Sequence, residues 1–175
     1  MHYLPKILVR INANEDREAK IRSARYIAES ETEDFYEKVW DWRETDTVGR
    51  WADEYPINVI LAEDNVDAFV KQLNHCKSLQ METMKDDLKT IQNGEFFQLF
   101  KEGKLEDIYN RPTISSLGPD LWRLHRIIKI LSGEYNPNSY FYSADDRNSR
   151  ITDELMNAIR KNPKEYALVV FDQPF

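Results

Sequence analysis

Residues 5–11, Pro-Lys-Ile-Leu-Val-Arg-Ile, begin with a proline and are followed by the turn signal Asn-Ala-Asn at 12–14. An aliphatic run bounded in this way predicts a β-strand. Three further stretches have the same character: 57–61 (INVIL), 140–142 (YFY) and 166–171 (YALVVF). Helical periodicity fills most of the chain between them. We therefore expect an α+β fold, in which a small mixed or antiparallel sheet of three to five strands packs with several helices.

Apolar residues at helical spacing predict the remaining elements. One helix is expected over 15–29, and the region 64–131 is expected to form a helical middle. Within it, a helix capped by Asp64 is followed by a separate helix that contains Met81 and Ile91. Residues 1–175 hold no repeat and no Ser/Gly-rich linker, so we expect a single domain.

Two later helices have clear start signals. Pro119 is placed to be the first residue of a helix that ends at Gly133, and Thr152 is placed to cap the last helix, which Asn162-Pro163 ends. The helix that starts at Pro119 has one apolar face, formed by Leu121, Leu124, Ile128 and Leu131.

Composition excludes several classes of protein. The 175 residues include 31 acids and 24 bases, for a net charge of −7, and one cysteine. A single cysteine excludes an internal disulfide framework, and the acidic balance makes direct nucleic-acid binding unexpected. No apolar run is long enough to cross a membrane and no signal-peptide pattern is present, so the expected location is the cytoplasm.

The negative charge is concentrated in one window. Residues 29–54 contain ten acids and three bases, whereas the rest of the chain contains 21 of each. The same window holds three of the four tryptophans. Tryptophan, tyrosine and arginine are the residue types that dominate binding hot spots. The candidate binding residues are therefore drawn from this window: Glu33, Glu37, Asp41, Trp42, Glu44, Arg50 and Trp51.

The window has two structural interpretations. On a helical wheel, the acids of 33–44 gather on one side and the apolar residues on the other, which favours a helix. The aromatic and β-branched content of the same residues favours a strand. Both remain open, with the helix preferred.

Catalytic and cofactor signatures are sparse. The five glycines are too scattered for a phosphate-binding loop, and the three histidines and Cys76 lack the spacing of a zinc site. Cys76 is expected to be a buried apolar residue. No cofactor or metal site is predicted, and no catalytic residue is assigned. A metal-dependent hydrolase or nuclease that uses the scattered acids Asp41, Asp46 and Asp145 is an alternative.

Two basic patches offset the acids. One lies on the Pro119 helix, with Arg123, Arg126 and Lys129, and the other lies in residues 147–164. The simplest interpretation of both is a charged, solvent-facing surface. They could also contact phosphates, or meet the acidic window of the same or a partner molecule.

The leading functional hypothesis is a small, non-enzymatic binding or regulatory protein whose window 29–54 contacts a basic protein surface. An inhibitor encoded by a phage or a mobile element is one form of it, because closely spaced carboxylates resemble the charge of a nucleic-acid backbone. The alternatives are the metal-dependent enzyme and a structural or self-associating module, for which a homo-oligomer is expected.

Overall fold

The computed structural model describes residues 2–39, 53–104, 106–107, 110, 119–171 and 173–174. Its centre is a four-stranded mixed sheet with the strand order β3-β5-β2-β4. The strands are β2 (Lys6–Arg10), β3 (Val59–Leu61), β4 (Phe141–Ser143) and β5 (Tyr166–Val170). Strand β5 is antiparallel to both β2 and β3, and β2 is parallel to β4. The α+β class and the mixed sheet expected from the sequence are confirmed.

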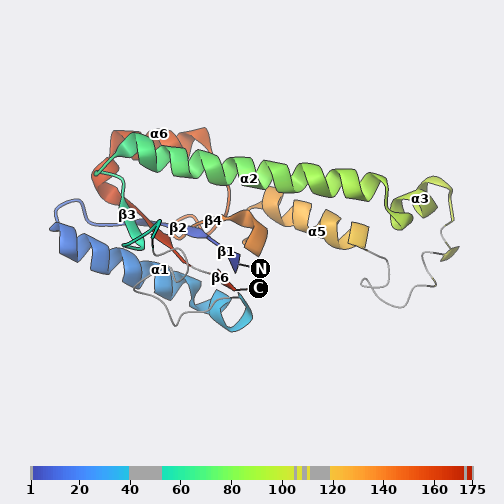
Figure 1. Cartoon of the computed structure of the whole chain (residues 1–175), viewed down its shortest axis with the longest axis horizontal. Coiled ribbons are helices and arrows are strands. Elements are labelled where there is room, and N and C mark those ends of the chain that lie inside the picture. The colour runs from blue at the N-terminus through green and yellow to red at the C-terminus, as the bar shows by residue number, and fades with distance from the viewer. Residues whose placement is uncertain are drawn as a thin grey trace.

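Both faces of the sheet are covered by helices, because side chains alternate along the strands. In β2, Ile7 and Val9 point to one face and pack with Ala24 and Ala28 of helix α1 (Arg17–Val39). Leu8 points to the other face, into a cluster with residues of α2 (Val66–Gln92) and α6 (Asp153–Lys161). Figure 1 shows α1 below the sheet, and α2 and α6 above it. The core is therefore divided into two layers by the sheet.

The two ends of the described chain meet in a small second pairing. Strand β1 (His2–Tyr3) is antiparallel to β6 (Gln173–Pro174). This pair lies near the middle of the molecule in Figure 1. The sequence did not predict it.

Helix α2 is longer than the sheet that it covers. Its Asn65 side chain caps the N-terminus by accepting a hydrogen bond from the backbone N–H of Ala68 at 3.0 Å. Phe69, Leu73 and Cys76 are buried on the sheet. The 27 residues span about 40 Å, so the C-terminal part of α2 projects beyond the sheet. Along that part run α5 (Pro119–Ser132) and, at its end, the short α3 (Glu95–Lys101).

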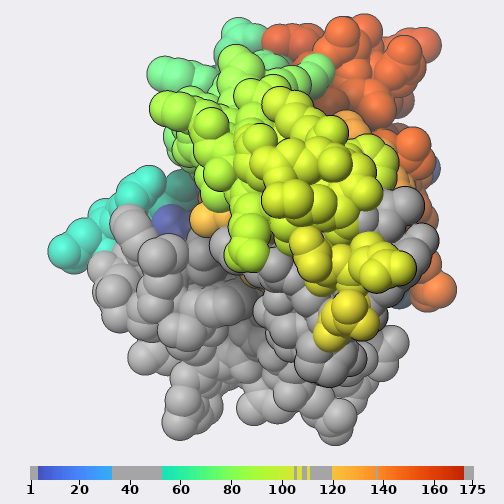
Figure 2. All heavy atoms as spheres, turned by 90° about the vertical axis from the view of Figure 1, so that its right-hand side faces the viewer, coloured from blue at the N-terminus to red at the C-terminus, as the bar shows by residue number. Residues whose placement is uncertain are grey.

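We call this projection the arm: residues 81–92 of α2, with α3 and α5. Helix α5 is antiparallel to α2 and leads back toward the sheet through the 3-10 turn η4 (Pro137–Ser139). In Figure 2, α2 and α3 (green to yellow) form the end of the arm that faces the viewer. In the described part of the chain, no helix is both long and apolar enough to cross a membrane.

Several predicted elements are confirmed and others are corrected. Helices α5 and α6 begin where Pro119 and the Thr152 cap predict, and the Thr152 hydroxyl accepts from the backbone N–H of Leu155 at 3.2 Å. The two helices predicted between residues 64 and 91 are one helix, α2, which the sequence analysis divided wrongly. Helix α1 extends to Val39, which confirms the helical interpretation of 33–44 for its first seven residues; residues 40–44 lie outside the described residues.

Candidate functional site: the arm

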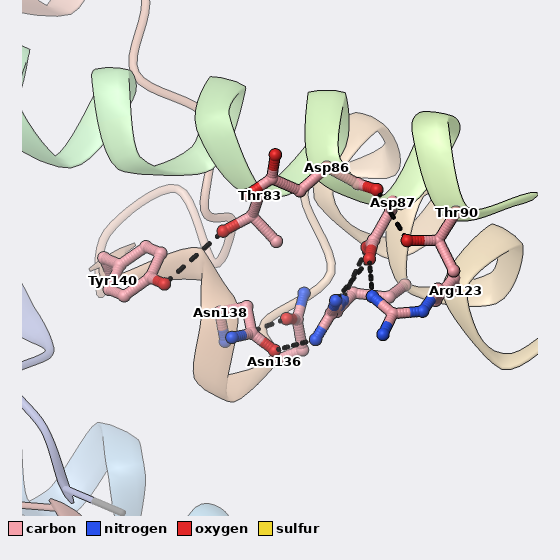
Figure 3. Close-up of polar contacts among 9 residues, drawn as sticks. Thr83, Asp86, Asp87, Thr90, Arg123, Asn136, Asn138 and Tyr140 are labelled. Carbon is pink, nitrogen blue, oxygen red and sulfur yellow. Dashed lines mark hydrogen bonds and ion pairs between the residues drawn. The ribbon is translucent and has the colours of Figure 1, made fainter. Parts of the chain in front are cut away.

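The centre of the arm is a buried ion-pair cluster around Asp87 of α2. Its side chain has no solvent exposure and lies against two guanidinium groups of α5. Arg123 Nη1 donates to Asp87 Oδ1 at 2.7 Å. Arg126 donates from Nε to Oδ2 at 2.7 Å and from Nη2 to Oδ1. Figure 3 shows the two guanidinium groups converging on this carboxylate. Paired guanidinium contacts of this kind fix both distance and orientation.

The geometry of this cluster fits a structural role. Both oxygens of Asp87 are engaged by arginine, and no part of the side chain reaches solvent. A general base needs an oxygen that can approach a substrate proton. The cluster instead fixes the register of α5 against α2.

One flank of the α2–α5 pair is covered by the segment that contains η4. Gln80 of α2 donates from Nε2 to the Ser139 carbonyl at 2.6 Å and to the Ser149 carbonyl at 2.9 Å. Arg126 donates to Asn138 Oδ1 at 3.0 Å. The hydroxyls of Thr83 and Tyr140 are 3.4 Å apart on the same side (Figure 3). We call this side the covered flank.

The far end of the arm is closed by Asp120, which is buried. Its Oδ2 accepts from the backbone N–H of Phe97 in the first turn of α3, at 3.3 Å. The backbone of Gly94 passes so close that a Cβ atom there would lie 2.2 Å from Asp120 Oδ2. Asp120 Oδ1 and Arg123 Nε are buried with no hydrogen-bond partner in the structure. Two polar atoms inside the arm therefore lack a hydrogen bond, and this lowers the free energy of unfolding.

The opposite flank of the arm is apolar and exposed. Ile127 is buried and lies about 40° from Arg123, which contacts α2. Counting about 100° per residue from Ile127 places Leu131, Leu124 and Ile128 at about 40°, 60° and 100°. Counting in the same sense from Asp87 places Met84, Leu88 and Met81 at about 60°, 100° and 120°. In an antiparallel pair, equal rotations in one sense lead to the same side. Both sets of side chains therefore lie on one side of the arm.

We call this side the open flank: Met81, Met84 and Leu88 of α2, with Leu121, Leu124, Ile128 and Leu131 of α5. Five of the seven side chains are exposed, by 39% (Leu124) to 62% (Leu131). Together they present on the order of 400 Å² of apolar surface, which is the size of the largest apolar patch on a typical monomer, and such a patch is often functional. The sequence predicted the apolar face of α5 from its spacing, and the structure turns that face outward.

The basic patch on α5 is corrected by the same geometry. Arg123 and Arg126 were expected on a solvent-facing surface, but they point inward and pair with Asp87. Asp87 itself is buried. Lys129 pairs with Glu134 at 2.6 Å. The missed signal is that Gln80, Thr83 and Asp87 continue the helical stripe that begins with buried Cys76.

A second polar cluster lies at the ends of β2 and β4. Arg10 is 4.0 Å from Asp145 and 3.0 Å from Glu165, and Arg147 is 3.4 Å from Glu31. Burial raises the pKa of Asp145 above its usual value, although Arg10 opposes this effect. Among the residues that the structure describes, no group of three or more His, Cys, Asp or Glu side chains is placed to hold a metal ion.

The predicted binding residues fall largely outside this description. The backbones of Glu33 and Glu37 belong to helix α1, but nothing is described of their side chains. Asp41, Trp42, Glu44, Arg50 and Trp51 lie outside the described residues, as does Asp46 of the alternative metal site. Of the acidic window, Glu31 makes an ion pair within the chain, and Asp53 and Glu54 are exposed.

Comparison with known proteins gives no family for the chain. No protein-family model matches it, and no curated protein or solved structure is found to be similar.

Proposed function

We propose that this protein is a small, non-enzymatic binding or regulatory protein, and that the arm is the element with which it holds a partner protein. The observation that supports the proposal is the open flank, where five large apolar side chains on two helices are exposed on the same side. Scattered single apolar residues on a surface need no explanation, whereas a contiguous patch does.

The construction of the arm supports the same proposal. The contact between α2 and α5 contains the buried carboxylate of Asp87 and the partly buried guanidinium groups of Arg123 and Arg126. Replacing a buried ion pair by apolar residues is often neutral or stabilising, so such a pair is weak evidence of selection for stability. Ile127 and Ile130 of α5 are buried, whereas Leu124, Ile128 and Leu131 stay exposed on the open flank, which suits a surface that a partner completes.

The test compares two double variants of the purified protein. Ile128→Glu with Leu131→Glu places two charges on the open flank. Asn157→Glu with Arg160→Glu places two acidic residues, also three apart, on the exposed side of α6. Each variant is used to capture proteins from its native host, and circular dichroism checks that both are folded. A photoreactive residue in place of Leu124 then reports whether the captured protein touches the flank.

The open-flank variant is expected to bind the partner with a dissociation constant more than about tenfold higher, because a carboxylate buried at an apolar interface is strongly unfavourable. The α6 variant is expected to retain it, and the residue at 124 to form a cross-link to it. A partner that both variants retain equally, with no cross-link from 124, would contradict the proposal.

The acidic window 29–54 is a second proposed contact, for a basic protein surface. Its support is the concentration of the whole net charge of −7 in this window. Changing Glu37, Asp41 and Glu44 to Lys is expected to weaken such binding and to flatten its dependence on salt concentration. Binding that is unchanged in this variant at low salt would rule this contact out.

A further inference from the structure

The margins of the open flank are basic. Counted at 100° per residue as for the open flank, Lys77, Lys85 and Lys89 of α2 fall at about 80°, 160° and 200° from Asp87. His125 of α5 falls at about 160° from Ile127. All four side chains are exposed. Lys77 pairs with Asp153, whereas Lys85 and Lys89 make no ion pair within the described part of the chain.

Two acids of α2 lie farther from the open flank than Lys85. Glu82 and Asp86 fall at about 220° and 260° from Asp87, so Glu82 lies beside Lys89 and Asp86 lies toward the covered flank. Asp87 and Asp120 are buried. The described surface around the open flank therefore combines an aliphatic strip with lysine and histidine at its edges.

We infer that the occupant of the open flank is an acidic amphipathic helix of a partner protein, with apolar residues at spacings of three and four and with Asp or Glu on either side of them. This inference rests on the proposed function of the arm. Two antiparallel helices leave a shallow groove between them, and a third helix fits such a groove by packing its apolar stripe into it. Acidic margins on that helix would meet the lysines of α2 and His125 of α5.

The length of the occupant follows from the flank. Leu121 and Leu131 are ten residues apart on α5, or about 15 Å. A partner helix of about three turns covers this distance. A second copy of this chain that docked through the same flank would bring basic margins against basic margins, which charge complementarity disfavours.

The experiment uses two synthetic helical peptides of about 15 residues with identical leucines at spacings of three and four. One carries glutamate and the other lysine at the positions beside the leucines. Each is labelled and titrated by fluorescence anisotropy with the wild-type protein, with the Lys85→Glu/Lys89→Glu variant, and with the Ile128→Glu/Leu131→Glu variant. Light scattering of the protein alone records its oligomeric state.

The acidic peptide is expected to bind wild type roughly tenfold more tightly than the basic peptide, with a preference that weakens as salt is added. The Lys85→Glu/Lys89→Glu variant is expected to reverse the preference, and the Ile128→Glu/Leu131→Glu variant to bind neither peptide. Equal affinity for the two peptides, with loss only in the open-flank variant, overturns the inference and leaves the proposed function standing.

Two other outcomes separate the alternatives. A wild-type dimer that the Ile128→Glu/Leu131→Glu variant converts to a monomer shows that the occupant is a second copy, and this also overturns the inference. Peptide binding that the open-flank variant retains in full counts against the proposed function itself.

Discussion

Replacing Asp87 by alanine removes the carboxylate that joins α2 to α5. The substitution leaves Arg123 and Arg126 without the partner that both contact, while their side chains are only 30% and 16% exposed. Arg126 keeps its hydrogen bond to Asn138 and its position over the Trp122 ring, 4.5 Å from the ring centroid. The variant therefore retains part of the covered flank and loses the contact at the centre of the arm.

The expected loss of unfolding free energy is about 3 kcal/mol. Removing one member of a buried ion pair costs roughly 3–5 kcal/mol, because the remaining charge stays buried without compensation. The lower end applies here, since both arginines keep some contact with water. An exposed ion pair, in contrast, contributes at most about 1 kcal/mol.

Urea unfolding followed by circular dichroism measures the difference, with Asp86→Ala as the matched control. Asp86 is the neighbouring residue on the same helix and its side chain is exposed, so its removal should change stability by less than about 0.5 kcal/mol. Equal, small losses for the two variants would show that the buried cluster does not hold the arm together.

Three further perturbations test other parts of the description. Gly94→Ala is expected to cost about 1–3 kcal/mol in urea unfolding, because the new Cβ meets the Asp120 carboxylate; an unchanged midpoint would contradict this contact. Tyr55 is buried, and this burial, aided by Glu54, raises its pKa to about 12. In the unfolded chain Tyr55 ionises near pH 10, so the free energy of unfolding falls as the pH rises from about 10 to 12. An absorbance titration of the wild type against Tyr55→Phe measures the pKa in the folded protein. Ionisation of Tyr55 near pH 10 in the folded protein would be inconsistent with its burial. Burial also raises the pKa of the Cys76 thiol. Thiol reagents are therefore expected to modify Cys76 only as fast as the protein unfolds. Rapid modification of the native protein would show that the contact between α2 and the sheet opens.

The strands and the starts of α5 and α6 could be predicted because their signals are local, whereas the predicted Asp64 cap was wrong by one residue, since Asn65 caps α2. The apolar runs at 5–11, 57–61 and 166–171 each correspond to a strand, and the Pro119 and Thr152 signals each begin a helix. Proline at the first helical position and threonine at the cap act through their own backbone neighbours. No long-range information is needed to recognise them.

The arm could not be predicted because its packing reverses the usual pattern. Two helices were predicted where α2 is continuous, the second of them with Met81 and Ile91. The stripe that begins with Cys76 continues through polar Gln80 and Thr83. In the structure, that stripe leaves the sheet and continues as a polar contact with η4 and α5. The inward side of α5 holds arginines, so amphipathicity alone places the wrong side against α2.

The proposed function requires the open flank to be exposed in the free protein and covered when a partner binds. Leu131→Cys places a thiol at its most exposed position, and buried Cys76 serves as an internal reference in the same molecule. In the free protein, the thiol at 131 is expected to react with a maleimide at a rate close to that of the unfolded chain, and the acidic peptide is expected to slow it at least about tenfold. A thiol at 131 that reacts as slowly as Cys76 in the free protein would show that the open flank is not exposed. A maleimide reaction rate that the acidic peptide leaves unchanged would show that the peptide does not cover it.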